Sequence, residues 1–126
     1  MREQKEAIFN NLSTQFNLPV FEDDIAEDEE KDLDKNGYNC FIFETGNFQP
    51  TQDFKKLSQD INVYYHSENK DDVDEMTIDI ISSLITVKGV YFTDSTKERM
   101  QMKDTDRFMD RVTITFTRKI PIEYQV

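Results

Sequence analysis

The chain of 126 residues has the length of a single domain with one core, and 37% hydrophobic against 33% charged residues is typical of a folded but polar protein. Its formal net charge is -11, and a surface this acidic disfavours sequence-specific binding of nucleic acid and binding to anionic membranes. The only cysteine, Cys40, excludes an intrachain disulfide and a CxxC metal or redox centre. The first residues lack the apolar core of a signal peptide, and no run of about 18 apolar residues occurs. We therefore expect a protein that is made in the cytoplasm and used there, or in a particle assembled there.

The first expected helix covers Arg2 to Asn17, where apolar residues recur at four-residue spacing: Ile8, Leu12 and Phe16. The next segment, Glu22 to Asp34, holds nine acidic residues and one lysine, so it carries -8 of the net charge. We expect residues 22–36 to form an acidic loop within the single domain 1–126.

Two strands are expected next. The run from Tyr38 to Glu44 is aromatic and β-branched, and glycines flank it on both sides. The second strand extends from about Lys55 to Ser67. Its large apolar side chains share odd-numbered positions: Leu57, Ile61, Val63 and Tyr65. The two strands are expected to pair across the loop 45–54.

The second expected helix, Asp71 to Lys88, begins with acidic residues that suit a helix N-terminus, and Gly89 follows it as a C-cap glycine. One stripe of this helix is mainly apolar: Val73, Met76, Thr77, Ile80, Leu84 and Val87. A short strand, Val90 to Thr93, and a polar stretch, Asp94 to Asp106, come next.

The last expected strand, Arg107 to Ile120, has an even-numbered face with Phe108, Val112, Ile114, Phe116 and Ile120. Its odd-numbered face is polar, with Arg111, Thr113, Thr115, Thr117 and Lys119. One face should therefore be buried, and the other should meet water or another subunit.

These elements predict an α+β fold of order α-β-β-α-β-β. It contains a mainly antiparallel sheet of about four strands, two helices packed on one face, and a long C-terminal β-hairpin. A strand of about fourteen residues spans roughly 45 Å, more than a small domain needs, so part of that hairpin is expected to project and to serve subunit contacts.

The segment Asp32 to Gly37 matches the start of a calcium-binding EF-hand loop. The twelfth position of such a loop would be Phe43, where a bidentate glutamate is needed, and Phe41 to Phe43 favours a strand over the second helix. A turn nucleated by Asn36 and Gly37 explains the segment more simply, and we expect no metal site.

Cys40 and the sole histidine, His66, could meet as a nucleophile and base pair. A buried thiol and a hydrogen-bonded histidine are the simpler interpretation. The three glycines, Gly37, Gly46 and Gly89, stand alone, so no nucleophile elbow or phosphate loop is present. We expect no catalytic residues, no cofactor and no enzymatic activity.

The last third of the chain gathers a basic cluster: Lys97, Arg99, Lys103, Arg107 and Arg111. It can be a solvated hairpin, or a basic patch that meets the acidic segment of a neighbouring subunit, a heterologous contact of the kind that closes rings. The candidate acidic residues, at a subunit interface or facing a lumen, are Glu27, Asp28, Glu29 and Glu30.

Four stretches together resemble small structural proteins of tailed phages of Gram-positive bacteria: Ile61 to Tyr65, Asn69 to Ile85, Lys97 to Gln101 and Asp104 to Arg107. Length and element order are similar to the tail terminator, or tail-to-head joining, proteins of long-tailed phages. This resemblance implies a hexameric ring, built on a helix-flanked sheet, that stops growth of the tail tube and joins it to the head.

The implied partners are further copies of the chain, the major tail tube protein and head-tail connector proteins, within a virion assembled in the host cytoplasm. An acidic loop facing the lumen of such a ring would repel phosphates and let DNA pass. The alternatives are a neck protein, a head-tail connector or another minor tail component. More distant is an acidic inhibitor that mimics DNA, although here most of the excess charge lies in one loop.

Overall fold

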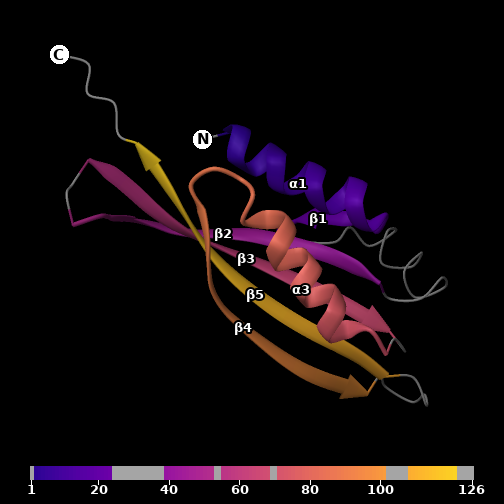
Figure 1. Cartoon of the computed structure of the whole chain (residues 1–126). Coiled ribbons are helices and arrows are strands. Elements are labelled where there is room, and N and C mark those ends of the chain that lie inside the picture. The colour runs from indigo at the N-terminus through magenta and orange to yellow at the C-terminus, as the bar shows by residue number, and fades with distance from the viewer. Residues whose placement is uncertain (1, 24–38, 53–54, 69–70, 102–107, 122–126) are drawn as a thin grey trace.

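The computed structural model of the chain describes residues 2–23, 39–52, 55–68, 71–101 and 108–121, and its fold is α+β, as predicted (Figure 1). The elements are, in order, α1 (Arg2–Phe16), β1 (Val20–Glu22), β2 (Cys40–Pro50), β3 (Lys56–Glu68), α3 (Val73–Leu84), β4 (Val90–Gln101) and β5 (Phe108–Pro121). Helix α1 ends one residue earlier than predicted, and Asn17 follows with a φ of 53°, a conformation that asparagine tolerates.

The described strands form a five-stranded mixed sheet of order β1-β2-β3-β5-β4. The prediction of about four mainly antiparallel strands missed β1, which pairs parallel with β2. A strand of three residues is too short to show an alternating pattern. Glu22, assigned to the acidic loop, is the last residue of β1, and the loop residues from 24 to 36 lie outside the described residues.

Two strands are longer than predicted. Strand β2 continues past Glu44 to Pro50, with a register shift between Thr45 and Phe48. Strand β4 continues to Gln101, so its second part was wrongly expected to be a connecting stretch. Nearly all of β4 is exposed, and a strand that is wet on both faces needs no alternation of apolar and polar residues.

Helix α3 ends at Leu84 rather than Lys88, so the prediction that Gly89 caps it is wrong. Gly89 serves the turn into β4, with a φ of +85° that favours glycine. The N–H of Val90 donates to the carbonyl of Val87 at 3.1 Å, and the N–H of Lys119 donates to the carbonyl of Gly89 at 2.9 Å. The glycine therefore joins the turn to β5.

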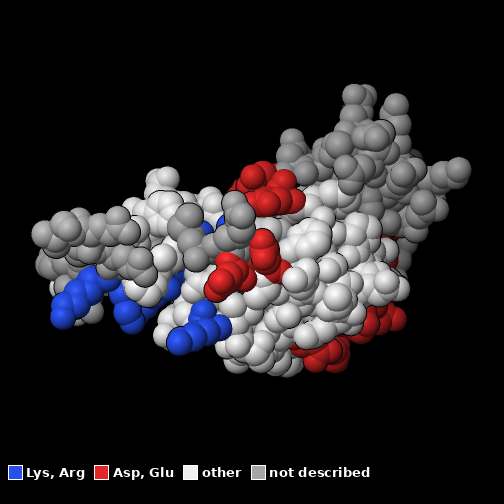
Figure 2. All heavy atoms as spheres, turned by 90° about the horizontal axis from the view of Figure 1, so that it is seen from above, with Lys and Arg blue, Asp and Glu red and all other residues white. Residues whose placement is uncertain are grey.

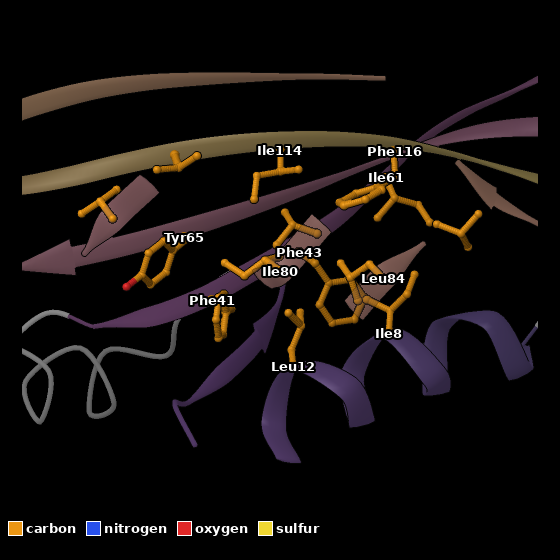
Figure 3. Packing of buried hydrophobic residues seen from close by; sticks show 14 residues of the cluster. Ile8, Leu12, Phe41, Phe43, Ile61, Tyr65, Ile80, Leu84, Ile114 and Phe116 are labelled. Carbon is orange, nitrogen blue, oxygen red and sulfur yellow. The ribbon is translucent and has the colours of Figure 1, made fainter. Parts of the chain in front are cut away.

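Both helices pack on the same face of the sheet, and one hydrophobic core lies between them and the strands (Figures 1 and 3). The core residues are Ile8 and Leu12 of α1, Val73, Ile80 and Leu84 of α3, and Phe41, Phe43, Ile61, Val63, Tyr65, Val90, Val112, Ile114 and Phe116 of the sheet. The predicted alternation of β3 and β5 is confirmed, because their apolar residues lie opposite one another on the buried face, as in the pair Val63 and Ile114.

One end of the sheet extends past the helices (Figure 1). We call this end the arm: Phe48–Pro50, Lys56–Gln59 and Arg118–Pro121. The sequence predicted that part of the C-terminal hairpin projects. The end of β5 does belong to the arm, but β4 does not extend into it, because β4 begins only opposite Arg118. The β2–β3 hairpin forms the rest of the arm, which was not predicted.

Candidate functional site

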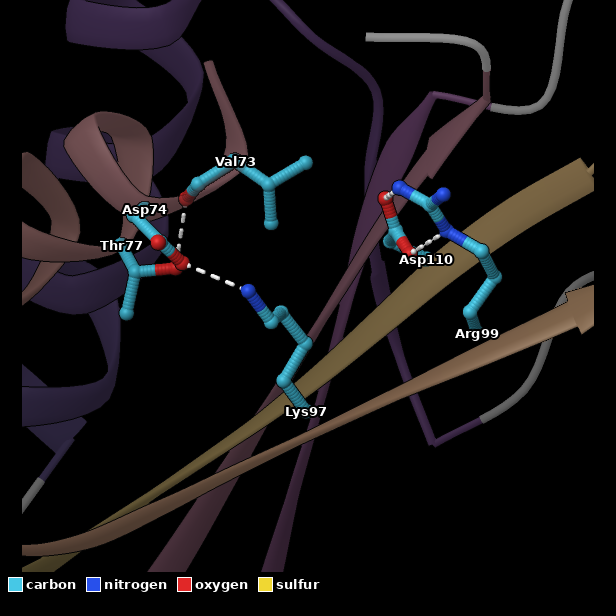
Figure 4. Close-up of polar contacts among 6 residues, drawn as sticks. All are labelled: Val73, Asp74, Thr77, Lys97, Arg99 and Asp110. Carbon is cyan, nitrogen blue, oxygen red and sulfur yellow. Dashed lines mark hydrogen bonds and ion pairs between the residues drawn. The ribbon is translucent and has the colours of Figure 1, made fainter. Parts of the chain in front are cut away.

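Two cations of the predicted basic cluster lie on β4 and are paired with carboxylates of the same chain (Figure 4). The Lys97 ammonium lies 2.8 Å from an oxygen of Asp74, in the first turn of α3. Arg99 donates to both oxygens of Asp110, from Nε at 2.9 Å and from Nη2 at 3.2 Å. Hydrogen bonds to these carboxylates raise the pKa of Lys97 and of Arg99. The charge of both side chains is therefore largely compensated within the chain.

Arg111 lies on the other face of the sheet. Its guanidinium is 4.6 Å from the ring centre of Tyr64 and 4.0 Å from a carboxylate oxygen of Glu98. The Tyr64 hydroxyl donates to Glu44 at 2.5 Å, which raises the pKa of Tyr64. The three described cations therefore do not form one patch. The other predicted interface residues lie outside the described residues: Glu27, Asp28, Glu29, Glu30, Lys103 and Arg107.

The face that carries Arg111 is polar, and no helix of the described part of the chain packs on it. Threonines of β5 reach across to β3 there. Thr115 donates to Asn62 and Thr117 donates to Asp60, each at 3.0 Å. We call this surface the open face. Its polar side chains form hydrogen bonds with one another across the strands. A polar face of this kind can contact water or another polar surface.

Strand β4 forms one edge of the sheet and pairs, among the described strands, with β5 alone. All of its residues except Val90 and Met100 are exposed, and Tyr91 and Phe92 are exposed aromatic side chains near its start. An exposed edge strand presents unpaired backbone N–H and C=O groups along its length. The β4 edge is therefore a surface on which another chain could add a strand.

A groove of about 520 Å³ lies between the first turns of α1, the turn from α3 to β4, and the arm. We call it the lysine groove, because three lysines line it: Lys56, Lys88 and Lys119. The remaining lining residues are Glu3, Gln4, Ala7, Val87, Gly89, Tyr91, Ile120 and Pro121. The Gln4 amide holds its walls together by donating to the carbonyls of Lys88 at 3.0 Å and Lys119 at 3.4 Å.

The positive charges of the groove lysines have fewer carboxylate partners than those of Lys97, Arg99 and Arg111. Neither Lys56 nor Lys88 forms an ion pair with a carboxylate among the residues that the structure describes. The Lys119 ammonium lies 5.3 Å from the ring centre of Tyr91. Figure 2 shows Lys and Arg side chains gathered toward the arm, while Asp and Glu side chains lie in separate groups farther along the same face. No local pattern in the sequence predicts this group, because its members are distant along the chain.

Cys40 and His66 do meet, with 3.9 Å between the thiol sulfur and Nδ1. Burial raises the pKa of Cys40 to about 12. Burial, with a smaller contribution from the charge of Arg111, lowers the pKa of His66 to about 4. Near neutral pH the pair is a thiol beside a neutral imidazole, without the thiolate that nucleophilic catalysis uses.

Within the described ranges, no group of three or more His, Cys, Asp or Glu side chains is placed to hold a metal ion. The segment that partly matches an EF-hand, residues 32–37, lies outside those ranges. None of the described helices is long and apolar enough to span a membrane.

The fold and its surfaces define an α+β protein whose sheet has one face covered by helices and one open face. No protein-family model matches the chain, and no curated protein does.

Proposed function

We propose that this chain is a structural protein of a phage virion, a tail terminator whose ring caps the tail tube and joins it to the head. The observation that carries the proposal is the unequal coverage of the sheet. Helices pack on one face, whereas the open face and the β4 edge have no partner among the described elements. Long strands with uncovered surfaces are what an assembly subunit needs.

A closed ring requires that two different surfaces of one subunit meet on the next. The β4 edge and the arm lie at different parts of the sheet, and each offers exposed groups. The resemblance to tail terminator proteins supports this assignment, through the length of the chain and its helices on one side of a sheet. The major tail tube protein and a head-tail connector are the proposed neighbours, and the virion is the proposed location.

The charge of the chain fits a ring through which DNA passes. The segment Glu22 to Asp34 carries -8, and carboxylates repel the phosphates of a duplex. Neutralising Glu27, Asp28, Glu29 and Glu30 should then slow DNA ejection, because the passage would bind phosphate more tightly. Unchanged ejection from particles that carry the neutralised protein would count against a lumenal position.

The test is electron microscopy of particles from a prophage that lacks this gene. We expect tails of abnormal length beside filled heads, because tube growth has lost its stop. Filled heads beside tails of normal length would instead assign the chain to the neck. Intact infectious particles would refute the structural role and favour an inhibitor that mimics DNA.

Complementation provides the matched control. The wild-type gene supplied in trans should restore particles, and so should a gene carrying Cys40→Ala and His66→Gln. Those substitutions remove the thiol and the imidazole but change neither the open face cations nor the lysine groove. Loss of complementation by this variant, with its fold intact, would indicate chemistry at the pair.

A further inference from the structure

Strand β4 and the neighbouring flank of α3 form one surface that no described element covers. Helix α1 contacts β1 whereas α3 contacts β5, so α3 is the helix nearer to β4 (Figure 1). The ion pair between Lys97 and Asp74 shows which flank of α3 faces β4. Positions four, seven and eleven residues after Asp74 lie on the same flank of a helix, and they hold Ile78, Ile81 and Ile85.

Large apolar side chains are exposed along this surface. Ile78 is 63% exposed, Ile85 50% and Phe92 41%. Phe92 lies on the face of the sheet that the helices cover, since its ring centre is 6.0 Å from that of the core residue Phe116. A strand added beside β4 would place its backbone against the unpaired edge and one of its faces against these apolar side chains. We call the β4 edge together with Ile78, Ile85 and Phe92 the edge site.

The occupant that fits the edge site is an extended segment in which apolar and polar residues alternate. The segment that follows β5, residues 122–126, has this pattern, since it reads Ile-Glu-Tyr-Gln-Val. It contains a single charge, and β4 has as many basic as acidic residues, so the two can meet although the whole chain has a net charge of -11. We propose that residues 122–126 of a second copy of this chain add as a strand to the edge site.

No described strand continues alongside this segment in its own molecule. Pro121, the last residue of β5, pairs with Lys56, the first residue of β3, and β4 begins only opposite Arg118. A proline also lacks the N–H group that a strand ladder uses, so pairing of β5 within its own sheet ends there. The backbone groups that follow Pro121 are therefore left for a strand of another molecule.

The segment is also too short to occupy the edge site of its own molecule. Its last residue lies five residues after Pro121, so it is at most about 18 Å from that proline. Phe92 pairs with Phe116, about 17 Å back along β5, and Lys97 pairs with Val112, about 30 Å back. A strand on the free side of β4 would lie about 10 Å farther across the sheet. Since the segment cannot run along the site within one chain, the copy that supplies it is a different one.

The contact joins two different surfaces, the segment after β5 on one copy and the edge site on the next, so copies associate head to tail. This inference rests on the proposed function for its ring, and names the two surfaces that join neighbouring subunits. Backbone hydrogen bonds along β4 and burial of the exposed apolar side chains both contribute to the affinity.

The first test measures the mass of the full-length protein by analytical ultracentrifugation over a range of concentration. The wild type should self-associate. Ile122→Ser with Tyr124→Ser should raise the dissociation constant at least about tenfold, because the added strand loses its apolar face. Glu123→Ala with Gln125→Ala is the matched control, which changes the other face and should alter the constant less than about threefold. Circular dichroism shows whether each variant is folded.

The second test changes the edge site. Ile78→Ser should weaken association more than Phe9→Ser, which also removes an exposed apolar side chain but lies on α1, outside the site. A one-to-one mixture of the segment variant and an Ile78→Ser, Ile85→Ser variant should stop at a dimer, because only one intact segment and one intact site remain. Hydrogen exchange should show β4 amides that are protected in the assembled wild type and exchange faster in both variants.

Several outcomes would overturn the inference: a wild type that stays monomeric, segment variants that associate like the wild type, or a mixture that yields no dimer. Association that needs the edge site but not the segment would mean that two β4 edges pair with each other instead. The tail terminator proposal is judged separately, by the particles of the deletion strain. Abnormal tails with segment-independent association would refute this contact alone, whereas intact particles with segment-dependent association would refute only the virion role.

Discussion

Acidification should destabilise the protein in part through the buried residue His66. Its side chain is only 7% exposed, and burial, followed by the nearby charge of Arg111, lowers its pKa from 6.5 to about 4. In the unfolded chain the same imidazole has its ordinary pKa near 6.5. The unfolded chain therefore binds a proton at a higher pH than the folded protein does.

The sign and size follow from this difference. Above about pH 6.5 both states are neutral and His66 contributes no pH dependence; between about 6.5 and 4, acid favours the unfolded chain. The difference of about 2.5 pKa units corresponds to about 3.4 kcal/mol once both states are protonated. At pH 5 the expected loss in the free energy of unfolding is about 2 kcal/mol.

The assay is urea denaturation followed by circular dichroism at pH 7, 6 and 5, for the wild type and for His66→Gln. Because His66 is the only histidine, the difference between the two pH profiles isolates it from the carboxylates. The variant should lose about 2 kcal/mol less than the wild type between pH 7 and 5. Parallel profiles, or an NMR titration of His66 with a midpoint near 6.5, would refute the reasoning.

Three further predictions concern stability and are checked by thermal and urea denaturation. Gly89→Ala should destabilise by about 1–2 kcal/mol, because φ is +85° and the new Cβ would lie 3.2 Å from a β5 carbonyl, whereas Gly46→Ala meets nothing closer than 3.6 Å and should be near neutral; equal effects would contradict this. Leu84→Ala, at a fully buried site, should cost about 2–5 kcal/mol, and a loss below about 1 kcal/mol would mean that the core closes over the gap. Arg99→Ala should lower the melting temperature more than Lys97→Ala. The first substitution leaves the buried carboxylate of Asp110 without its partner, whereas the Lys97–Asp74 pair is exposed at both ends. A larger loss for Lys97→Ala would contradict this reasoning.

The sequence predicts the parts of this fold that have a buried face and a regular period. Strands β3 and β5 were found because every second residue, such as Val63 or Ile114, lies in the core. Helix α3 was found from its apolar stripe, but its end was not, since Val87 continues the stripe within a turn. The polar part of β4 was not predicted, because neither face of this exposed edge strand has to be apolar and its sequence therefore shows no alternation.

The candidate site was harder to predict, because alternation along a strand separates residues that are neighbours in sequence. The cations of the C-terminal hairpin are close together in the sequence, yet Arg99 and Arg111 lie on opposite faces of the sheet. The lysine groove has the opposite property, since Lys56 and Lys119 come together only through the β3–β5 register. No local motif encodes such a pair.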